Sequence, residues 1–246
     1  MVADGVLIVP SYPHPTHVIS PTVRLTLLGM FGVLAIAPAI PDIIRRALPP
    51  GKAHRLPMPA LVVAAAVQTS ALVLLSAWIG VRFGAKVGMH SWIADGVISS
   101  APSPGALFQA IVVAIAIGAT GGFVAHACAP ALTVYFGLTP LHVRVLYGGL
   151  TEEVLVRWGL LAGLSATLLA TLHEQSGLTA VVLSNALFSV AHLPALRAGG
   201  VHRSARAPLV IFAVTLPWGW LCLRYGLEAA VIAHVSFHLA AEVRRA

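Results

Sequence analysis

Charged residues are scarce in this sequence of 246 residues. Only 9% are Asp, Glu, Lys or Arg, whereas 58% are hydrophobic. The mean hydropathy is +0.90, which excludes an ordinary soluble domain, where about a quarter of the residues are charged. The apolar residues form several runs near the roughly 20 residues that a helix needs to cross a bilayer. We therefore expect an integral membrane protein in which one bundle uses nearly the whole chain.

Cysteine is also scarce. Cys128 and Cys222 both lie in apolar runs and form no CxxC spacing, which indicates neither a disulfide framework nor a zinc knuckle. The net charge of +7 does not indicate a nucleic-acid partner, because the Lys and Arg residues stand in short connections between apolar runs. Such residues are typical topology signals of membrane proteins.

The beginning of the sequence lacks the pattern of a cleaved signal peptide, a basic segment followed by an apolar run and a small-residue cleavage site. We expect the first apolar run to be kept as a span. The prolines of "MVADGVLIVPSYPHPTHVISP" predict an irregular tail over residues 1–22. Residues 23–246 are then expected to form a single transmembrane domain.

The long, unalternating apolar runs predict an all-α fold, a polytopic transmembrane helical bundle with seven or eight spans. The range 106–136 is the ambiguous one, because it suits one tilted helix or two short helices broken near Gly121 and Gly122 or at Pro130. The expected spans are 23–40, 60–81, 106–136, 145–172, 178–195, 208–223 and 227–241.

The distribution of Lys and Arg predicts the orientation of the second half of the chain. With eight spans and the N-terminus inside, nine of these residues lie in the cytoplasm and five outside. With seven spans and the N-terminus outside, the ratio is ten to four. Both versions place Arg144, the loop 196–207 and the C-terminus in the cytoplasm. The ten residues of the seven-span version are Arg45, Arg46, Lys52, Arg55, Arg144, Arg197, Arg203, Arg206, Arg244 and Arg245.

The stretch "GGLTEEVLVRWGLL", residues 148–161, places charge inside an expected span. An ionisable residue at the centre of a span costs about 2.5–3.5 kcal/mol on insertion scales, so such residues usually face the bundle interior and serve a function. Glu153 and Arg157 are four residues apart in the order that favours an ion pair on a helix, which predicts a structural pair. Glu152 is rotated by about 100° from this pair, so we expect its carboxylate to be free to act.

Three histidines are expected at a similar depth in later spans. His192 stands near the end of one span, and His234 and His238 are four residues apart in the last one, which lets both imidazoles address one point. Given the predicted orientation, Glu152 and all three histidines fall in the cytoplasmic half of the membrane. This convergence predicts a common site.

These residues resemble the motifs of the CPBP intramembrane proteases, which include the type II CAAX prenyl endopeptidases and Abi-type bacteriocin-immunity homologues. The family motifs EExxxR, FxxxH and HxxxN correspond here to Glu152 to Arg157, Phe188 to His192 and His234 to His238. The resemblance covers about residues 145–241, the expected catalytic core. The sequence departs from the prenyl endopeptidases at His238, where they carry asparagine.

The resemblance implies an intramembrane endopeptidase that cuts a membrane-associated peptide or protein near the cytoplasmic face. Glu152 and His192 would position and deprotonate a water molecule, and His234 and His238 would stabilise the oxyanion. Glu153, Arg157 and Phe188 would be structural supports. The protein is expected in the lipid bilayer of a bacterial cytoplasmic membrane, and the oligomeric state is left open.

Two alternatives concern the cofactor and the function. Glu152, His192, His234 and His238 could instead ligate a divalent metal ion such as zinc, whose bound water would be the nucleophile. The chain could also be a non-proteolytic immunity or peptide-binding protein, or a proton-coupled transporter, although inverted repeats that would favour a transporter are not visible. Other intramembrane protease classes are excluded, because the sequence lacks HExxH and GxSG motifs and an aspartate pair within its spans.

Overall fold

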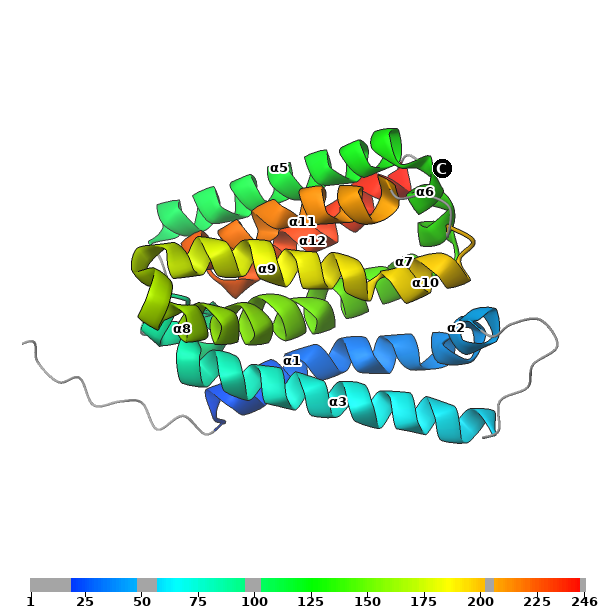
Figure 1. Cartoon of the computed structure of the whole chain (residues 1–246), viewed down its shortest axis with the longest axis horizontal. Helices are drawn as coiled ribbons and strands as arrows, with labels where there is room; N and C mark the ends of the chain where they lie inside the picture. Colours follow the sequence, from blue (N-terminus) through cyan, green and yellow to red (C-terminus); the bar gives the residue numbers. More distant parts are fainter. Residues whose placement is uncertain (1–18, 48–56, 96–102, 202–205, 244–246) are drawn as a thin grey trace, which may run out of the picture.

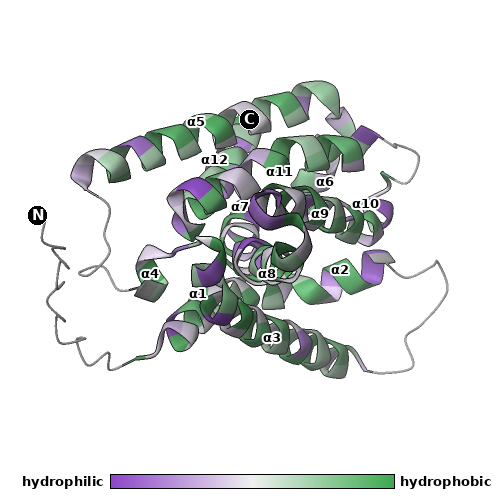
Figure 2. Ribbon diagram, turned by 60° about the vertical axis from the view of Figure 1, so that its left-hand side comes forward, coloured by the Kyte–Doolittle hydropathy of each residue, from purple (hydrophilic) through white to green (hydrophobic). Residues whose placement is uncertain are grey.

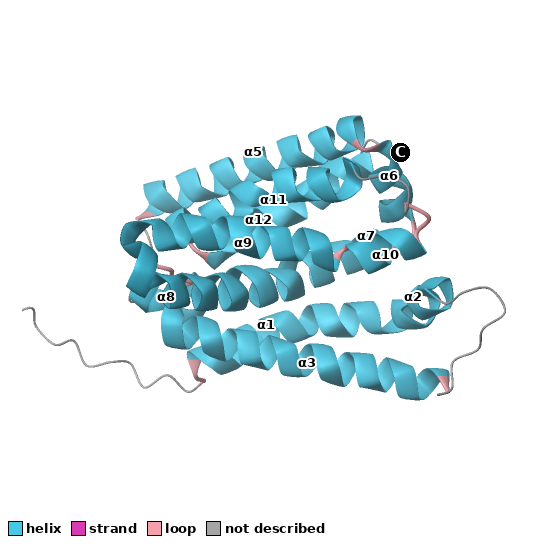
Figure 3. Ribbon diagram, viewed as in Figure 1, coloured by secondary structure: helices cyan, strands magenta, loops and turns pink. Residues whose placement is uncertain are grey.

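The computed structural model describes residues 19–47, 57–95, 103–201 and 206–243, and the regular elements in these ranges are all helical (Figure 3). The expected all-α membrane bundle is confirmed. The elements, in order, are α1 (Pro21–Ile36), η1 (Ala37–Ala39), α2 (Ile40–Ala47), α3 (Met58–Phe83), η2 (Gly84–Val87), α4 (Trp92–Asp95), α5 (Pro104–Cys128), α6 (Pro130–Gly137), α7 (Leu141–Val143), η3 (Arg144–Glu152), η4 (Val154–Leu160), α8 (Leu161–Leu172), η5 (His173–Gln175), α9 (Ser176–Ala191), α10 (Leu193–Ala198), α11 (Arg206–Tyr225) and α12 (Leu227–Val243).

The first helix begins inside the range that the sequence assigned to an irregular tail. Pro21 is its first residue, and the Ser20 hydroxyl caps it by accepting a hydrogen bond from the backbone N–H of Val23 at 3.3 Å. Proline suits this position because its missing N–H would have no partner in the first turn. The rest of the predicted tail, residues 1–18, lies outside the described residues.

Within the ranges that the structure describes, five helical stretches are long and apolar enough to cross a membrane. One of them is 58 residues long and reverses near His173, so that α8 and α9 lie side by side (Figure 1). α12 has 17 residues, and α6, which follows a break at Pro130, has only eight. The number of seven or eight spans stays a prediction. The five stretches are Pro21–Arg46, Met58–Val87, Pro104–Cys128, Leu141–Ala198 and Arg206–Tyr225.

The helical run from α7 to α8 lies at the centre of the bundle. On one side it packs against α1 and α3, and on the other side against α9 and α12. α11 packs against α9 and α12, while α5 covers α12 from outside. The motif residues of the sequence therefore lie on the inner elements.

The outer helices present large apolar side chains to the surroundings. Phe31 and Leu34 on α1, Val67 on α3 and Phe108 on α5 are all more than 60% exposed. Figure 2 shows that apolar residues dominate the lengths of α3 and α5. A soluble protein rarely exposes such large apolar surfaces, and these faces fit contact with lipid.

The contact between α5 and α12 depends on small residues. A Cβ atom at Gly118 would lie 2.0 Å from the carbonyl oxygen of Ala233, and one at Gly122 would lie 2.6 Å from that of Phe237. Glycines four residues apart let two membrane helices approach closely, so that van der Waals packing and not the hydrophobic effect holds them together. This contact fixes the helix that carries His234 and His238.

Gly118→Ala is expected to lower the free energy of unfolding by about 1–3 kcal/mol, the usual cost of overpacking, because the α5 and α12 backbones must separate. Gly105→Ala is the matched control, since it is on the same helix and a Cβ there would have no atom within 4 Å. Unfolding by sodium dodecyl sulfate in mixed micelles would measure both variants. Equal stabilities would contradict the close contact.

The centre of the bundle departs from α-helical geometry. η3 and η4 are π-helical, with Glu153 between them, although the sequence predicted an ordinary helix over this range. π-helical turns are rare and frequently occur at functional sites. Of the first motif, Glu152 lies on the wall of a cavity, whereas Glu153 and Arg157 are fully buried behind it.

Candidate active site

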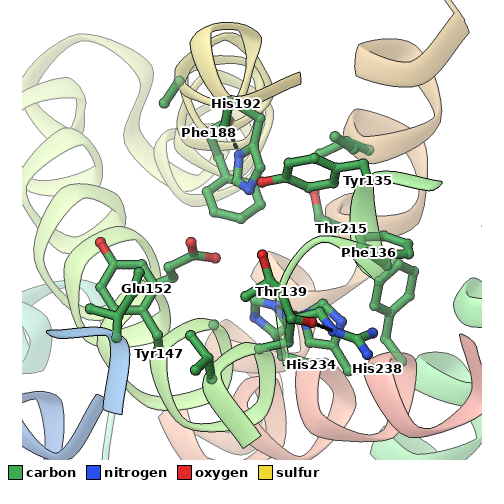
Figure 4. Close-up of a pocket in the computed structure, with 18 of the residues that line it drawn as sticks. Tyr135, Phe136, Thr139, Tyr147, Glu152, Phe188, His192, Thr215, His234 and His238 are labelled. Atoms are coloured by element: carbon green, nitrogen blue, oxygen red, sulfur yellow. Dashed lines mark hydrogen bonds between the residues drawn. The ribbon is translucent and has the colours of Figure 1, made fainter. Parts of the chain in front are cut away.

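A cavity of about 420 Å³ opens inside the bundle between η3, α9, α11 and α12. Its wall is mostly apolar, with contributions from α2 and α6 as well. All four residues predicted to be catalytic line it, namely Glu152, His192, His234 and His238 (Figure 4). They come from three segments that are up to 86 residues apart in sequence, and the fold brings them around one space.

Glu152 and His192 stand on different walls of this cavity. The Glu152 carboxylate points into the space between His192 on one side and the pair of His234 and His238 on the other (Figure 4). The Nδ1 atom of His192 lies 2.9 Å from the carbonyl oxygen of Phe188, so Nδ1 carries the proton and donates it to this oxygen. In the neutral ring Nε2 is then an unprotonated acceptor.

Phe188 supports His192 on the same helix face. The two rings lie edge to face with centroids 4.4 Å apart, and Phe188 is buried. Aromatic pairs prefer this arrangement. Together, the ring contact and the Phe188 carbonyl leave the imidazole little freedom to rotate, as the structural role predicted for Phe188 requires.

Glu153 holds His234 in place across two helices. Its Oε1 atom lies 2.7 Å from His234 Nδ1, and its side chain is completely buried. His234 therefore donates Nδ1–H to the carboxylate, and its Nε2 faces His238 Nε2 at 3.2 Å. A carboxylate behind a histidine fixes the tautomer and orientation of the ring.

The positions of the protons in the histidine pair determine what the pair can bind. When both rings are neutral, His238 must donate Nε2–H to the bare Nε2 of His234. His238 Nδ1 then has no proton, and it is a buried atom without a hydrogen-bond partner among the described residues. The neutral pair thus uses its single Nε2–H internally, and it offers a free N–H only after it takes up a proton.

Gly148 explains how the pair fits against η3. A Cβ atom at this position would lie 3.0 Å from His234 Nε2 and 3.2 Å from His238 Nε2. Both imidazoles therefore rest against a bare stretch of helix backbone. The glycine next to the first motif is required for this close approach.

Arg157 neutralises Glu153 and connects it to the rest of the core. Its Nε lies 3.5 Å from Glu153 Oε2, and both side chains are fully buried, which agrees with the pair expected from the sequence. The Nη2 atom donates to Asn185 Oδ1 at 3.0 Å and to the Thr215 carbonyl at 3.2 Å. The guanidinium also lies over the Phe188 ring, 4.8 Å from its centroid.

One hydrogen bond and two lining residues of the site were not predicted from the sequence. The Glu153–His234 hydrogen bond joins residues 81 apart, and the sequence assigned Glu153 to Arg157 alone. Tyr135 and Tyr147 line the cavity, and neither belongs to a motif.

Arg144 was not predicted as a site residue either. From the sequence it was interpreted as a topology signal in a loop. It lies at the start of η3, is only 7% exposed and lines the cavity. Its Nε donates to the Thr139 carbonyl at 3.1 Å, and its Nη2 pairs with the Glu242 carboxylate. No period or motif in the sequence distinguishes this buried arginine from those in the connections.

The geometry of these side chains decides whether they can ligate a divalent metal ion. Among the residues that the structure describes, no group of three or more His, Cys, Asp or Glu is arranged to hold one. The Nε2 atoms of His234 and His238 face each other, and Glu153 is bound to His234. This arrangement does not fit the four-residue ligand set considered from the sequence.

Comparison with known proteins bears on the second half of the chain. Residues 134–240 match the family model "Type II CAAX prenyl endopeptidase Rce1-like". Neither a curated protein nor a solved structure matches the chain. The matched segment contains all seven predicted site residues, which are Glu152, Glu153, Arg157, Phe188, His192, His234 and His238. The resemblance read from the three motifs is confirmed, because residues 134–240 match the Rce1-like model of the type II CAAX prenyl endopeptidases.

Proposed function

We propose that this chain is an intramembrane endopeptidase that hydrolyses a peptide bond of a membrane-associated substrate with a water molecule activated by Glu152 and His192. The observation that carries the proposal is the meeting of the three motifs around one cavity of about 420 Å³. Intramembrane ionisable residues are costly and usually serve a function, and four of them line this one space.

The first step is attack by water on the scissile carbonyl. Glu152 takes one proton from the water while His192 Nε2 accepts a hydrogen bond from it and fixes its position. The water oxygen bonds to the carbonyl carbon, and the carbonyl oxygen takes the negative charge. General-base catalysis of this kind typically contributes about 10²–10⁴ in rate.

The second step breaks the carbon–nitrogen bond. Glu152 returns its proton to the leaving nitrogen, so that the products are a carboxylic acid and an amine. The pair of His234 and His238 stabilises the intermediate from its protonated form, which supplies an N–H to the oxyanion. Glu153 orients His234 for this role through the contact between its Oε1 and His234 Nδ1.

The orientation of the site follows from charge. The cavity wall includes residues of α2 and α10, which lie at the same end of the bundle as the C-terminus of α12 (Figure 1). In the seven-span arrangement predicted from the sequence, the connections assigned to the cytoplasm carry nine Lys or Arg residues when the buried Arg144 is left out, and the other side carries four. The positive-inside rule assigns the richer end to the cytoplasm, so cleavage is proposed near the cytoplasmic face.

N-terminal peptides of membrane fractions test the proposal. Cells that express the wild-type protein are compared with cells that express Glu152→Ala at the same level. We expect new N-termini in the wild-type sample only, and these would also identify the substrate. Identical termini from two folded, equally abundant proteins, in a host known to contain the natural membrane proteome, would instead favour peptide binding or immunity.

A further inference from the structure

The cavity contains a cation that the proposed mechanism does not use. Arg144 is buried, and its guanidinium has five N–H groups. Thr139 and Glu242 engage Nε and Nη2. The remaining nitrogen, Nη1, is buried and has no hydrogen-bond partner among the described residues.

A buried donor without a partner is costly, at about 1–3 kcal/mol and more for a charged group. Native proteins keep few of them, and each needs an explanation. The Glu242 carboxylate is 35% exposed on its side-chain surface and contacts a different nitrogen, so it does not satisfy Nη1. The arginine retains an unused capacity for an anionic oxygen.

Arg144 lies next to the histidine pair. The Phe136 ring contacts both groups, because its centroid is 5.6 Å from that of His238 and 5.9 Å from the Arg144 Cζ atom. Arg144 also stands four residues before Gly148, against which the two Nε2 atoms rest. Because Arg144 also lines the cavity, an oxygen that reached Nη1 would belong to a substrate in the same cavity as the histidine pair.

The neutral histidine pair has no free N–H that could bind an anionic oxygen. Its single Nε2–H is spent between the two rings, whereas a guanidinium is always charged and needs no proton uptake. Arg46, the other arginine at the cavity, is exposed and bonds the Leu138 carbonyl through Nη1. Arg144 is the buried cation of the cavity wall within the described residues.

We infer that Arg144 forms an anion subsite of the cavity, in which Nη1 binds a negatively charged oxygen of the peptide substrate. This inference rests on the proposed function for the identity of the ligand but not for the binding itself. Two sources share this chemistry: the oxyanion that develops at the scissile carbonyl, and a carboxylate that the peptide carries in its ground state.

Binding of small probes to the purified protein tests the subsite without requiring proteolysis. The probes are a blocked alanyl-alanine phosphinate, which carries a tetrahedral anion, N-acetyl-dialanine with a free carboxylate, and its neutral amide. Isothermal titration in detergent micelles gives each Kd. We expect Arg144→Gln to weaken one or both anionic probes at least tenfold and to leave the amide unchanged.

Three variants separate binding from structure. Glu242→Gln removes the ion pair but keeps the guanidinium, so probe affinity should stay within about threefold of the wild type. Arg144→Lys keeps the charge, should remain folded and should recover part of the affinity. Free guanidinium should restore anion binding to Arg144→Ala. Weaker binding of the phosphinate by Arg144→Gln would assign the subsite to the oxyanion. Weaker binding of the free carboxylate would assign it to a carboxylate of the substrate.

The inference is overturned if all three probes bind the wild type and Arg144→Gln alike. It is also overturned if Glu242→Gln and Arg144→Gln lose the same affinity, because the arginine would then act only through its ion pair. If the anionic probes bind through Arg144 but no cleavage is found in membranes, the proposed function fails and the subsite stands.

Discussion

The Glu152→Gln variant of the purified protein is expected to lose a factor of about 10²–10⁴ in kcat, the usual contribution of a general base. Glutamine has nearly the same size and shape, so the cavity wall is kept, but its amide cannot take a proton from water. The substrate identified from membrane peptides would be assayed with the protein in lipid nanodiscs.

Glu174→Gln is the control for this loss. Glu174 is an exposed carboxylate on η5, away from the cavity, and its removal should leave kcat unchanged. KM should change little in either variant, because Glu152 acts on water and not on the bound peptide. A Glu152→Gln protein that keeps more than a tenth of the rate would remove Glu152 from the role of base.

Glu153→Ala is expected to destabilise the fold by about 3–5 kcal/mol, because it leaves the buried Arg157 charge without its carboxylate. His234 would lose its hydrogen-bond acceptor at the same time. The free energy of unfolding would be measured by sodium dodecyl sulfate titration in mixed micelles. Asp42→Ala is the matched control, since Asp42 forms an exposed ion pair with Arg45, and such pairs contribute about 0–1 kcal/mol.

The double variant Glu153→Met with Arg157→Met separates stability from activity. Replacing a buried ion pair by apolar side chains of similar volume is often neutral or stabilising, so much of the lost stability should return. Turnover should not return, because nothing would then orient His234. A double variant that regained full activity would show that Glu153 serves only to neutralise Arg157.

The motif residues could be predicted from the sequence for a definite physical reason. Charge inside an apolar span is rare enough to be noticed, and the order of spans fixes the depth of each residue. Glu152, His192 and the pair in α12 were expected to meet on these grounds, and they line one cavity. Depth along the membrane, however, says little about which side chain touches which.

Contacts between helices could not be predicted in this way. The bond from Glu153 to His234 depends on how η3 and η4 rotate, and their π-helical geometry leaves no mark on the apolar periodicity. Arg144 could not be predicted for a different reason. An arginine at the end of a span is typical of a loop, and only packing reveals that this one is buried. The break of the third run at Pro130 was among the expected positions, since proline cannot donate to the preceding turn.

The small residues between α5 and α12 limit how closely lipid can approach the helix with His234 and His238. Because Gly118 and Gly122 bring the two backbones into contact, an acyl chain has no space to enter between them. On the side that α5 covers, the helix with His234 and His238 is thus separated from hydrocarbon by one helix. On that side, lipid chains are kept away from the cavity that the two histidines line.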